Sequence, residues 1–185
     1  MICIIDCGSS WIEDIKLNLK KINYDSSRNL KMNDLKESNL ERFSHIIISG
    51  RPTFLTQENI PELLDLFSFI KTTNIPILGI CFGHQIIGLL YGSTIDIGKS
   101  INKMENIQLI GENKLFNSIK NLSLFQESHS EFISLPKDFI LLAKSESCQN
   151  EAMKHKNRII YSTQFHPEVS SKEGQRLINN FLKIE

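Results

Sequence analysis

Cys81 lies between two glycines in the run Gly79-Ile80-Cys81-Phe82-Gly83, a G-x-C-x-G pattern. This pattern has the form of a nucleophile elbow, in which a sharp turn from a strand into a helix exposes a nucleophilic side chain. At the N-terminus of a helix, the dipole and the free N–H groups favour a thiolate. A single cysteine is more often a buried structural residue, but the flanking glycines favour the interpretation of Cys81 as a nucleophile.

A cysteine nucleophile needs a base and a second group that orients the base. His166 and Glu168 occur in Gln164-Phe165-His166-Pro167-Glu168, after an apolar run typical of a strand. Because residues i and i+2 of an extended chain share a side, we expect Glu168 to hold the ring of His166. His166 would then take the thiol proton while Glu168 stabilises the imidazolium. The alternative is a His-Pro-Glu turn on the surface, which the G-x-C-x-G pattern upstream disfavours.

Two further histidines are candidates for the base. His84 lies three residues after Cys81 on the same expected helix, so its ring points along that helix rather than across the sulfur. We therefore expect His84 to pack or to support the loop. The place of His129 stays open, because nothing in the sequence puts it firmly inside or outside the site.

Strands and helices must alternate to bring these residues together. Short apolar runs predict buried strands at residues 2–5, 45–48, 75–80 and 158–165. Helices are predicted from about 11 to 22, with Ser9 or Ser10 as the cap and Leu17 on the apolar side, and at 33–40, 59–71, 83–91 and from Ser171 or Glu173 onward. This rhythm predicts one α/β domain over residues 1–185 with a mostly parallel sheet. Residues 94–142 have shorter apolar runs, which favours an antiparallel extension.

The composition excludes several classes of function. The 185 residues include 21 basic and 21 acidic side chains, and zero net charge argues against binding to nucleic acid or to a membrane surface. No apolar run approaches the roughly 18 residues of a membrane span, and the N-terminus lacks the basic region of a signal peptide. We therefore expect a cytoplasmic protein with reduced thiols. Its four cysteines form no CxxC pair, so we expect neither disulfides nor a metal.

Three sequence blocks resemble the class I (triad) glutamine amidotransferases. They are the runs from Pro76 to Gln85 and from Gln164 to Glu168, and Ser49-Gly50-Arg51-Pro52, which falls where the family carries its glycine-rich oxyanion loop. The blocks come in the family's order and spread over most of the chain. Within the family, the chain is most similar to the separate glutaminase subunits of archaeal-type GMP synthetases. That closer resemblance rests on Asp6-x-Gly8-Ser9, on Ser128-His129, and on the run from Cys148 to Lys156.

The resemblance implies a flavodoxin-like, three-layer fold and hydrolysis of the side-chain amide of L-glutamine. The ammonia would pass to a separate ATP-pyrophosphatase subunit, most readily for amination of XMP to GMP. Cys81 matches the nucleophile, His166 the general base and acid, and Glu168 its orienting group. Backbone N–H groups of Arg51 and Phe82 match the oxyanion hole. The positions matching glutamine-binding residues are Gly50, Gln85, Ser128, His129 and Ser130. The chain itself would need no cofactor, since ATP and Mg²⁺ belong to the partner.

The sequence departs from the family's pattern at two positions. Arg51 stands where the oxyanion loop usually has a second glycine, and Ser130 stands where a glycine usually follows Ser-His. If Arg51 must adopt φ > 0 to aim its N–H, it meets a steric penalty that glycine avoids. The loop would then form its active state more slowly or only with a partner. Alternatively, the Arg51 guanidinium would bind a carboxylate or phosphate near the site.

Other functions stay open. The chain lacks both a G-x-x-x-x-G-K-[ST] phosphate loop and a Ser-Gly-Gly-x-Asp-Ser loop, so it cannot itself activate an acceptor with ATP. One alternative is a stand-alone hydrolase of another γ-glutamyl compound, and another is a catalytically inactive regulatory subunit. Residues 151–156 are a candidate docking surface or, equally, an ordinary solvated turn.

Overall fold

A nine-stranded sheet runs through the protein, whose computed structural model describes residues 1–184. The strand order is β2-β1-β3-β4-β9-β8-β7-β5-β6. The first five strands are parallel: β2 (Ser27–Lys31), β1 (Ile2–Asp6), β3 (His45–Ile48), β4 (Ile77–Ile80) and β9 (Ile160–Thr163). The last four are antiparallel: β8 (Ala152–His155), β7 (Phe139–Lys144), β5 (Ile95–Leu109) and β6 (Ser123–Ile133). The predicted α/β class with an antiparallel extension is confirmed.

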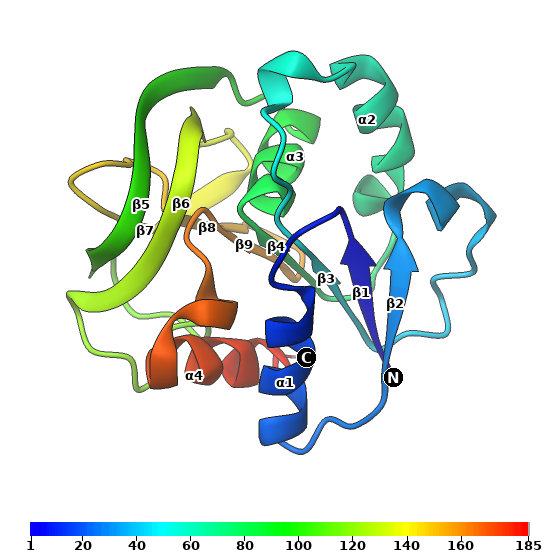
Figure 1. Ribbon diagram of the computed structural model, residues 1–185, viewed down its shortest axis with the longest axis horizontal. Helices are drawn as coiled ribbons and strands as arrows, with labels where there is room; N and C mark the ends of the chain where they lie inside the picture. Colours follow the sequence, from blue (N-terminus) through cyan, green and yellow to red (C-terminus); the bar gives the residue numbers. More distant parts are fainter. Residues whose placement is uncertain (185) are drawn as a thin grey trace.

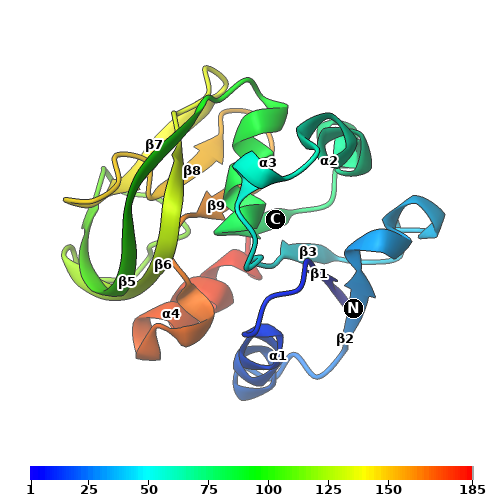
Figure 2. The same ribbon diagram turned by 45° about the horizontal axis from the view of Figure 1, so that its top comes forward.

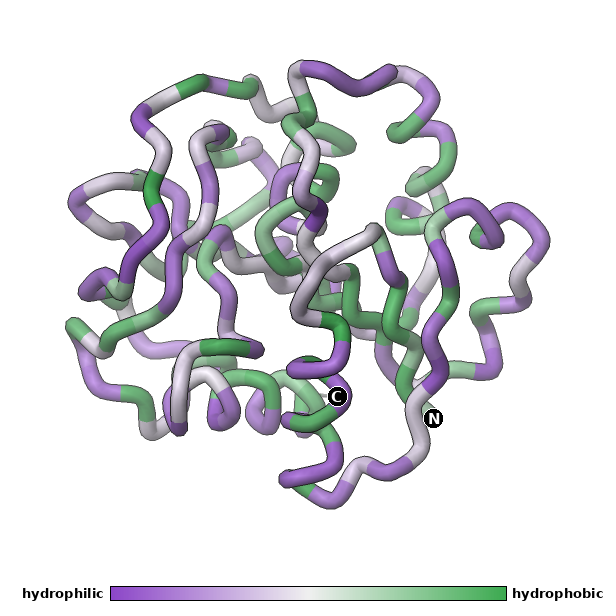
Figure 3. The backbone as a smooth tube through the Cα atoms, viewed as in Figure 1, coloured by the Kyte–Doolittle hydropathy of each residue, from purple (hydrophilic) through white to green (hydrophobic). Residues whose placement is uncertain are grey.

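Helices cover both faces of the parallel strands and so give three layers (Figure 1, Figure 2). On one face, α1 (Ile12–Lys21) and α4 (Ser171–Phe181) enclose one hydrophobic cluster. On the other face, α2 (Ile60–Leu66) and α3 (Phe82–Leu90) enclose a second cluster. The strands between them are apolar on both sides, which places the hydrophobic segments at the centre of the molecule (Figure 3). Burying each such side chain contributes about 1.5–3 kcal/mol.

Helix α1 begins differently from the sequence prediction. Trp11 occupies its N-cap position and makes no capping bond with its side chain. The predicted cap Ser9 instead accepts a hydrogen bond from the N–H of Trp11 at 3.1 Å. Leu17 is 48 % exposed, contrary to the prediction, because 100° per residue turns it away from the buried Ile15 and Leu19.

Two other predicted helices are shorter than expected. Residues 59–71 divide at Phe67 into α2 and the 3₁₀ turn η3 (Ser68–Lys71), although Asn59 does cap α2 by accepting from the N–H of Glu62. Residues 33–40 contribute only the 3₁₀ helix η1 (Met32–Glu37), in which Leu35 alone is buried. One buried side chain gives too little packing to stabilise a longer helix. The remaining 3₁₀ turns are η2 (Leu55–Gln57) and η4 (Pro167–Val169).

Residues 151–156 are not a solvated turn. They contain β8, which pairs with β7 on one side and β9 on the other. Glu151, Ala152 and Met153 are completely buried. The sequence also did not predict the edge strand β2, whose pattern is mostly polar. No helix among residues 1–184 is long and apolar enough to cross a membrane.

Candidate active site

Cys81 occupies a strained turn between β4 and α3. Its backbone has φ 50° and ψ −100°, a conformation that costs energy for any residue other than glycine. The turn is possible because its flanking glycines have no side chains. A Cβ on Gly79 would lie 2.6 Å from the carbonyl of Gly83, and a Cβ on Gly83 would lie 2.6 Å from the carbonyl oxygen of Ile48. The turn therefore places Cys81 at the carboxyl end of the parallel strands, where open α/β sheets bind ligands.

His166 and Glu168 follow β9 and face one another. The Nδ1 atom of His166 lies 2.8 Å from Oε1 of Glu168, and both side chains are buried. The backbone N–H of His166 donates to the carbonyl of Gln126 at 2.9 Å, which fixes the start of the turn. The indole of Trp11 meets the imidazole edge-on, with ring centroids 4.4 Å apart.

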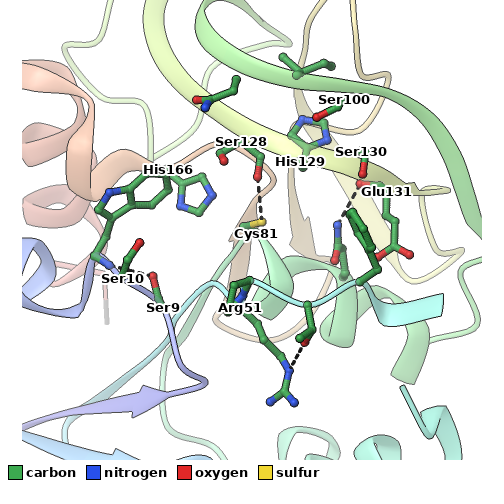
Figure 4. A pocket seen from close by; sticks show the side chains of 17 residues that line it. Ser9, Ser10, Arg51, Cys81, Ser100, Ser128, His129, Ser130, Glu131 and His166 are labelled. Atoms are coloured by element: carbon green, nitrogen blue, oxygen red, sulfur yellow. Dashed lines mark hydrogen bonds between the residues drawn. The ribbon is translucent and has the colours of Figure 1, made fainter. Parts of the chain in front are cut away.

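Gly50 brings the loop after β3 against this pair. A Cβ on Gly50 would lie 3.0 Å from Cε1 of His166 and 3.7 Å from Cβ of Cys81. The imidazole of His166 lies beside the Cys81 sulfur (Figure 4). The loop after β3, the elbow after β4 and the turn after β9 thus converge on one point.

The charges at this point favour a protonated His166. Burial lowers the pKa of the imidazole, but the Cys81 sulfur and the Glu168 carboxylate outweigh it and raise the pKa to about 10. A thiolate beside an imidazolium is a nucleophile with a proton donor next to it. This arrangement can attack a carbonyl carbon and then protonate the leaving group.

A cleft of about 360 Å³ opens above the Cys81 sulfur (Figure 4). Its walls come from the loops after β1 and β3, from the elbow, and from the strands β5 and β6. Predicted site residues in this lining are Arg51, Cys81, Gln85, Ser128, His129, Ser130 and His166. The volume lies within the range of small-molecule sites. Gly50, Phe82 and Glu168 lie behind or beside the lining rather than in it.

Gln85 is engaged within the protein. Its Nε2 donates to the carbonyl of Glu131 at 2.9 Å and to Oε1 of Gln164 at 3.1 Å. The Nε2 of Gln164 in turn points to the Cys81 sulfur at 3.6 Å. This chain of contacts joins strand β6 to the nucleophile. In this conformation Gln85 supports the cleft wall, and its amide N–H groups are not available to a ligand.

Arg51, which stands where the oxyanion loop is expected to carry a second glycine, has a backbone conformation that does not require glycine. Arg51 does not have a positive φ, so the anticipated steric penalty does not arise in this conformation. Its guanidinium pairs with Glu58 at 2.8 Å, donates to Thr53, and lies over the Phe82 ring at 5.7 Å. The side chain therefore points away from Cys81 (Figure 4). Its carboxylate partner is internal, rather than a ligand in the cleft.

Glu131 is a cleft residue that the sequence prediction missed. Its buried carboxylate accepts hydrogen bonds from the N–H of Leu55 at 2.6 Å and from the N–H and hydroxyl of Thr56 at 3.0 and 2.5 Å. It thereby attaches the loop after β3 to β6. The alternation along β6 was the available signal, because it places Glu131 on the inner face together with Phe125 and Ile133.

His84 packs in the core, as predicted. It is completely buried, and its Nδ1 lies 2.8 Å from the hydroxyl of Ser162. Burial and the neighbouring His129 lower the pKa of His84 to about 3. A ring that stays neutral and faces away from the sulfur is no base for Cys81.

His129 lies in the cleft wall with its side chain turned inward. Its Nε2 is 3.0 Å from Oε2 of Glu127, and its side chain is 2 % exposed. Together with Glu151, these residues are the one group within residues 1–184 that is close enough to share a metal ion, since their polar atoms lie within 4.8 Å of one another. The spacing of the cysteines could not have indicated this group, because no cysteine takes part in it.

Comparisons with known proteins give the family. Residues 3–184 match the family described as Glutamine amidotransferase class-I. The glutamine-hydrolyzing GMP synthase subunit of Pyrococcus abyssi is 34 % identical, and the match covers 100 % of this chain and 98 % of that protein. The corresponding subunit of Methanocaldococcus jannaschii is also 34 % identical, with coverage of 100 % and 97 %.

Solved structures agree with the assignment. A crystal structure of a GMP synthase subunit from Thermoplasma acidophilum has a TM-score of 0.87 at 30 % identity, covering 98 % of this chain and 91 % of that one. A glutamine amidotransferase from Thermotoga maritima has a TM-score of 0.73 at 21 % identity, covering 97 % and 81 %, and supports the fold. This chain belongs to the class I glutamine amidotransferase family.

Proposed function

We propose that this chain is the glutaminase subunit of a two-chain GMP synthetase. It would hydrolyse L-glutamine to glutamate and ammonia and deliver the ammonia to a separate ATP-pyrophosphatase subunit that aminates XMP. The observation that carries the proposal is the approach of Cys81 to the buried His166–Glu168 pair at the floor of the cleft. The names of the relatives support the acceptor.

The first half of the reaction forms a thioester. The Cys81 thiolate attacks the side-chain carbonyl carbon of glutamine, and negative charge develops on the carbonyl oxygen. Backbone N–H groups of Phe82, in the first turn of α3, and of Arg51 are the proposed donors to this oxygen. One such donor contributes about 3–4 kcal/mol. The His166 imidazolium then protonates the nitrogen, the C–N bond breaks, and ammonia leaves.

The second half releases glutamate. Neutral His166 takes a proton from a water molecule, which attacks the thioester carbon. The C–S bond breaks, and the Cys81 thiolate and the His166 imidazolium are restored. Glu168 keeps the imidazole oriented through both halves and stabilises its charged form. The sum is one water consumed and one ammonia released for each glutamine.

The proposed partner follows from what the sequence lacks. No ATP-binding loop of either kind is present, so activation of the acceptor requires a second chain that carries ATP and Mg²⁺. The two subunits would then form a hetero-oligomer through which ammonia passes. The four cysteines are free, which supports a cytoplasmic location for this reaction.

The test is glutamate release from glutamine by the purified chain, alone and with a candidate ATP-pyrophosphatase subunit, XMP, ATP and Mg²⁺. We expect low release alone and a large increase with the complete mixture. Cys81→Ala should abolish both activities. Cys3→Ala is the matched control, because Cys3 is a buried thiol on β1 whose pKa burial raises to about 11.

The other outcomes separate the alternatives. Release that does not respond to the partner would contradict the two-chain proposal and favour a stand-alone hydrolase of γ-glutamyl compounds. No release in any mixture would favour a regulatory subunit.

A further inference from the structure

The inner face of β6 carries charged residues where a strand normally buries apolar ones. Glu127, His129 and Glu131 alternate along this face, between Phe125 and Ile133. Glu131 is satisfied by its three hydrogen bonds from the oxyanion loop. Glu127 accepts no such hydrogen bond within residues 1–184, although it is completely buried. The Nε2 of His129 lies 3.0 Å from its Oε2, but without the geometry of a hydrogen bond. A buried carboxylate without donors is costly, so another group must compensate it.

That group is a second buried carboxyl. Glu151, the residue before β8, is also completely buried, and a carboxyl oxygen of Glu151 lies within 4.8 Å of one of Glu127. The hydroxyl of Ser145 donates to Oε1 of Glu151 at 2.6 Å. Two carboxylates this close in a buried site repel each other, and one proton on the pair removes that repulsion. We call Glu127 and Glu151 the buried acid pair.

The surroundings supply little positive charge to this pair. From β5, the carboxylate of Glu105 adds negative charge, and the mostly exposed Lys103 reaches Glu105 only at 3.9 Å. From α3, His84 is neutral. From the turn after β9, the charge of His166 lowers the pKa of Glu127 from across the site, but less than burial raises it.

The thiol of Cys148 also faces the acid pair, and burial keeps that thiol protonated. Burial likewise raises the pKa of Glu127 to about 8 and the pKa of Glu151 well above its usual value. The balance of charges therefore agrees with the geometry, because both disfavour two ionised carboxylates at this place.

The buried acid pair holds the stretch of β6 between two other attachments of this strand. Among the strands of residues 1–184, β6 pairs only with β5, and β5 pairs with β7 only at Gln108 and Leu109. Elsewhere β6 is attached at Gln126, whose carbonyl accepts from the N–H of His166, and at Glu131, which accepts from Leu55 and Thr56. The contact from Glu127 to Glu151 joins the middle of β6 directly to the start of β8. The residues next to that contact are Ser128, His129 and Ser130, which line the cleft.

We infer that Glu127 and Glu151 share one proton and are positioning residues that hold His129 and the segment 128–130 in place for substrate. His129 lies against Glu127 through its Nε2, and the carbonyl of Ser128 faces the Cys81 sulfur at 4.0 Å. A shift of the acid pair therefore moves the cleft wall next to the nucleophile. The inference rests on the proposed function, because it assumes that glutamine binds along this segment.

The experiment compares Glu127→Gln, Glu127→Ala and Glu151→Gln with wild type, and uses the exposed Glu112→Gln as the control. The amide of glutamine donates a hydrogen bond permanently and so replaces the shared proton. Glu127→Gln and Glu151→Gln should leave KM for glutamine close to that of wild type. Glu127→Ala removes the contact and should raise KM roughly tenfold or more. The rate at which iodoacetamide alkylates Cys81 should not change, because the His166–Glu168 pair is untouched.

A second measurement does not depend on activity. At neutral pH, the infrared spectrum of wild type should contain the carbonyl band of a protonated buried carboxyl group. The band should disappear in Glu127→Gln and in Glu151→Gln, and it should persist in Glu112→Gln.

Several results would overturn the inference. One is a wild type without that infrared band, and another is a KM that Glu127→Ala leaves unchanged. A metal ion that co-purifies stoichiometrically and is lost in Glu127→Gln would mean that a cation, not a proton, compensates the pair. If wild type releases no glutamate with any partner while the infrared band is present, the proposed function fails but the shared proton stands.

Discussion

Around Cys81, single atoms decide the geometry. Gly83 is required because the carbonyl oxygen of Ile48 occupies the space of a Cβ, whereas a Cβ on Gly50 would lie 3.0 Å from the His166 ring and would make it shift. These demands explain why the G-x-C-x-G pattern could be recognised from sequence. The ion pair between Arg51 and Glu58 could not be predicted from the sequence, because only the path of the loop brings the two residues together.

Trp11 offers a direct test of the charge on His166. It is the only tryptophan in the chain, and its ring is 4.4 Å from the imidazole. An imidazolium quenches indole fluorescence more strongly than a neutral imidazole does. Because the pKa of His166 is raised to about 10, fluorescence should stay low at neutral pH and increase as the pH rises through about 10.

A fluorescence titration of wild type and of His166→Asn checks this expectation. The asparagine variant should lack the transition. A wild-type transition near the ordinary histidine value of about 6.5 would show that the thiolate and Glu168 do not hold the proton on His166.

At the scale of elements, the apolar strands were the easiest to predict. β1, β3 and β4 are continuous apolar runs, and their burial on both faces explains the match. β2 is a polar edge strand, and β8 combines two buried residues with two half-buried ones, so neither has a periodic signal. β6 alternates clearly, but its inner face is charged, which concealed the roles of Glu127 and Glu131.

The attachment of the oxyanion loop to β6 is an element-scale prediction. Glu131→Ala removes three hydrogen bonds that hold η2, and leaves their donors to water. Hydrogen bonds to charged groups contribute about 1.5–3 kcal/mol each, so we expect a loss of at least that size in the free energy of unfolding. We also expect kcat to fall by up to about a hundredfold, because the proposed oxyanion donor at Arg51 loses its position.

Chemical denaturation and steady-state glutaminase kinetics measure the two effects. Glu131→Gln keeps one acceptor oxygen and should lie between wild type and Glu131→Ala in both. An unchanged kcat in Glu131→Ala would mean that the loop is held by other contacts, such as the pair of Arg51 and Glu58.

At the scale of the whole molecule, stability should depend on the buried acid pair. Burial raises the pKa of Glu127 from 4.5 to about 8, so the folded protein holds a proton that the unfolded chain releases between those values. The contribution of Glu127 to stability is therefore greatest at low pH and is lost as the pH rises from about 4.5 to about 8. The loss should amount to a few kcal/mol.

Two histidines also contribute to the pH dependence of stability. The raised pKa of His166 gives stability that is lost as the pH rises from about 6.5 to about 10. The lowered pKa of His84 has the opposite effect: the stability of the folded protein increases as the pH rises from about 3 to about 6.5. The Glu127 contribution is isolated by subtracting the unfolding free energies of Glu127→Gln from those of wild type at each pH.

The free energy of unfolding of wild type should therefore fall relative to that of Glu127→Gln as the pH rises from about 4.5 to about 8. A difference that is independent of pH would contradict the protonated state of the pair in the folded molecule.

The central claim is that Cys81 is a nucleophile that recognises glutamine. The most direct measurement is peptide mass spectrometry of the chain after incubation with a glutamine analogue that carries an electrophilic diazoketone in place of the amide. We predict one covalent adduct per chain, on Cys81, with glutamine protecting against it and His166→Asn slowing it. The other three cysteines are buried thiols with raised pKa values and should stay unmodified. No adduct on Cys81, even with the partner present, or equal labelling of another cysteine, would contradict the claim.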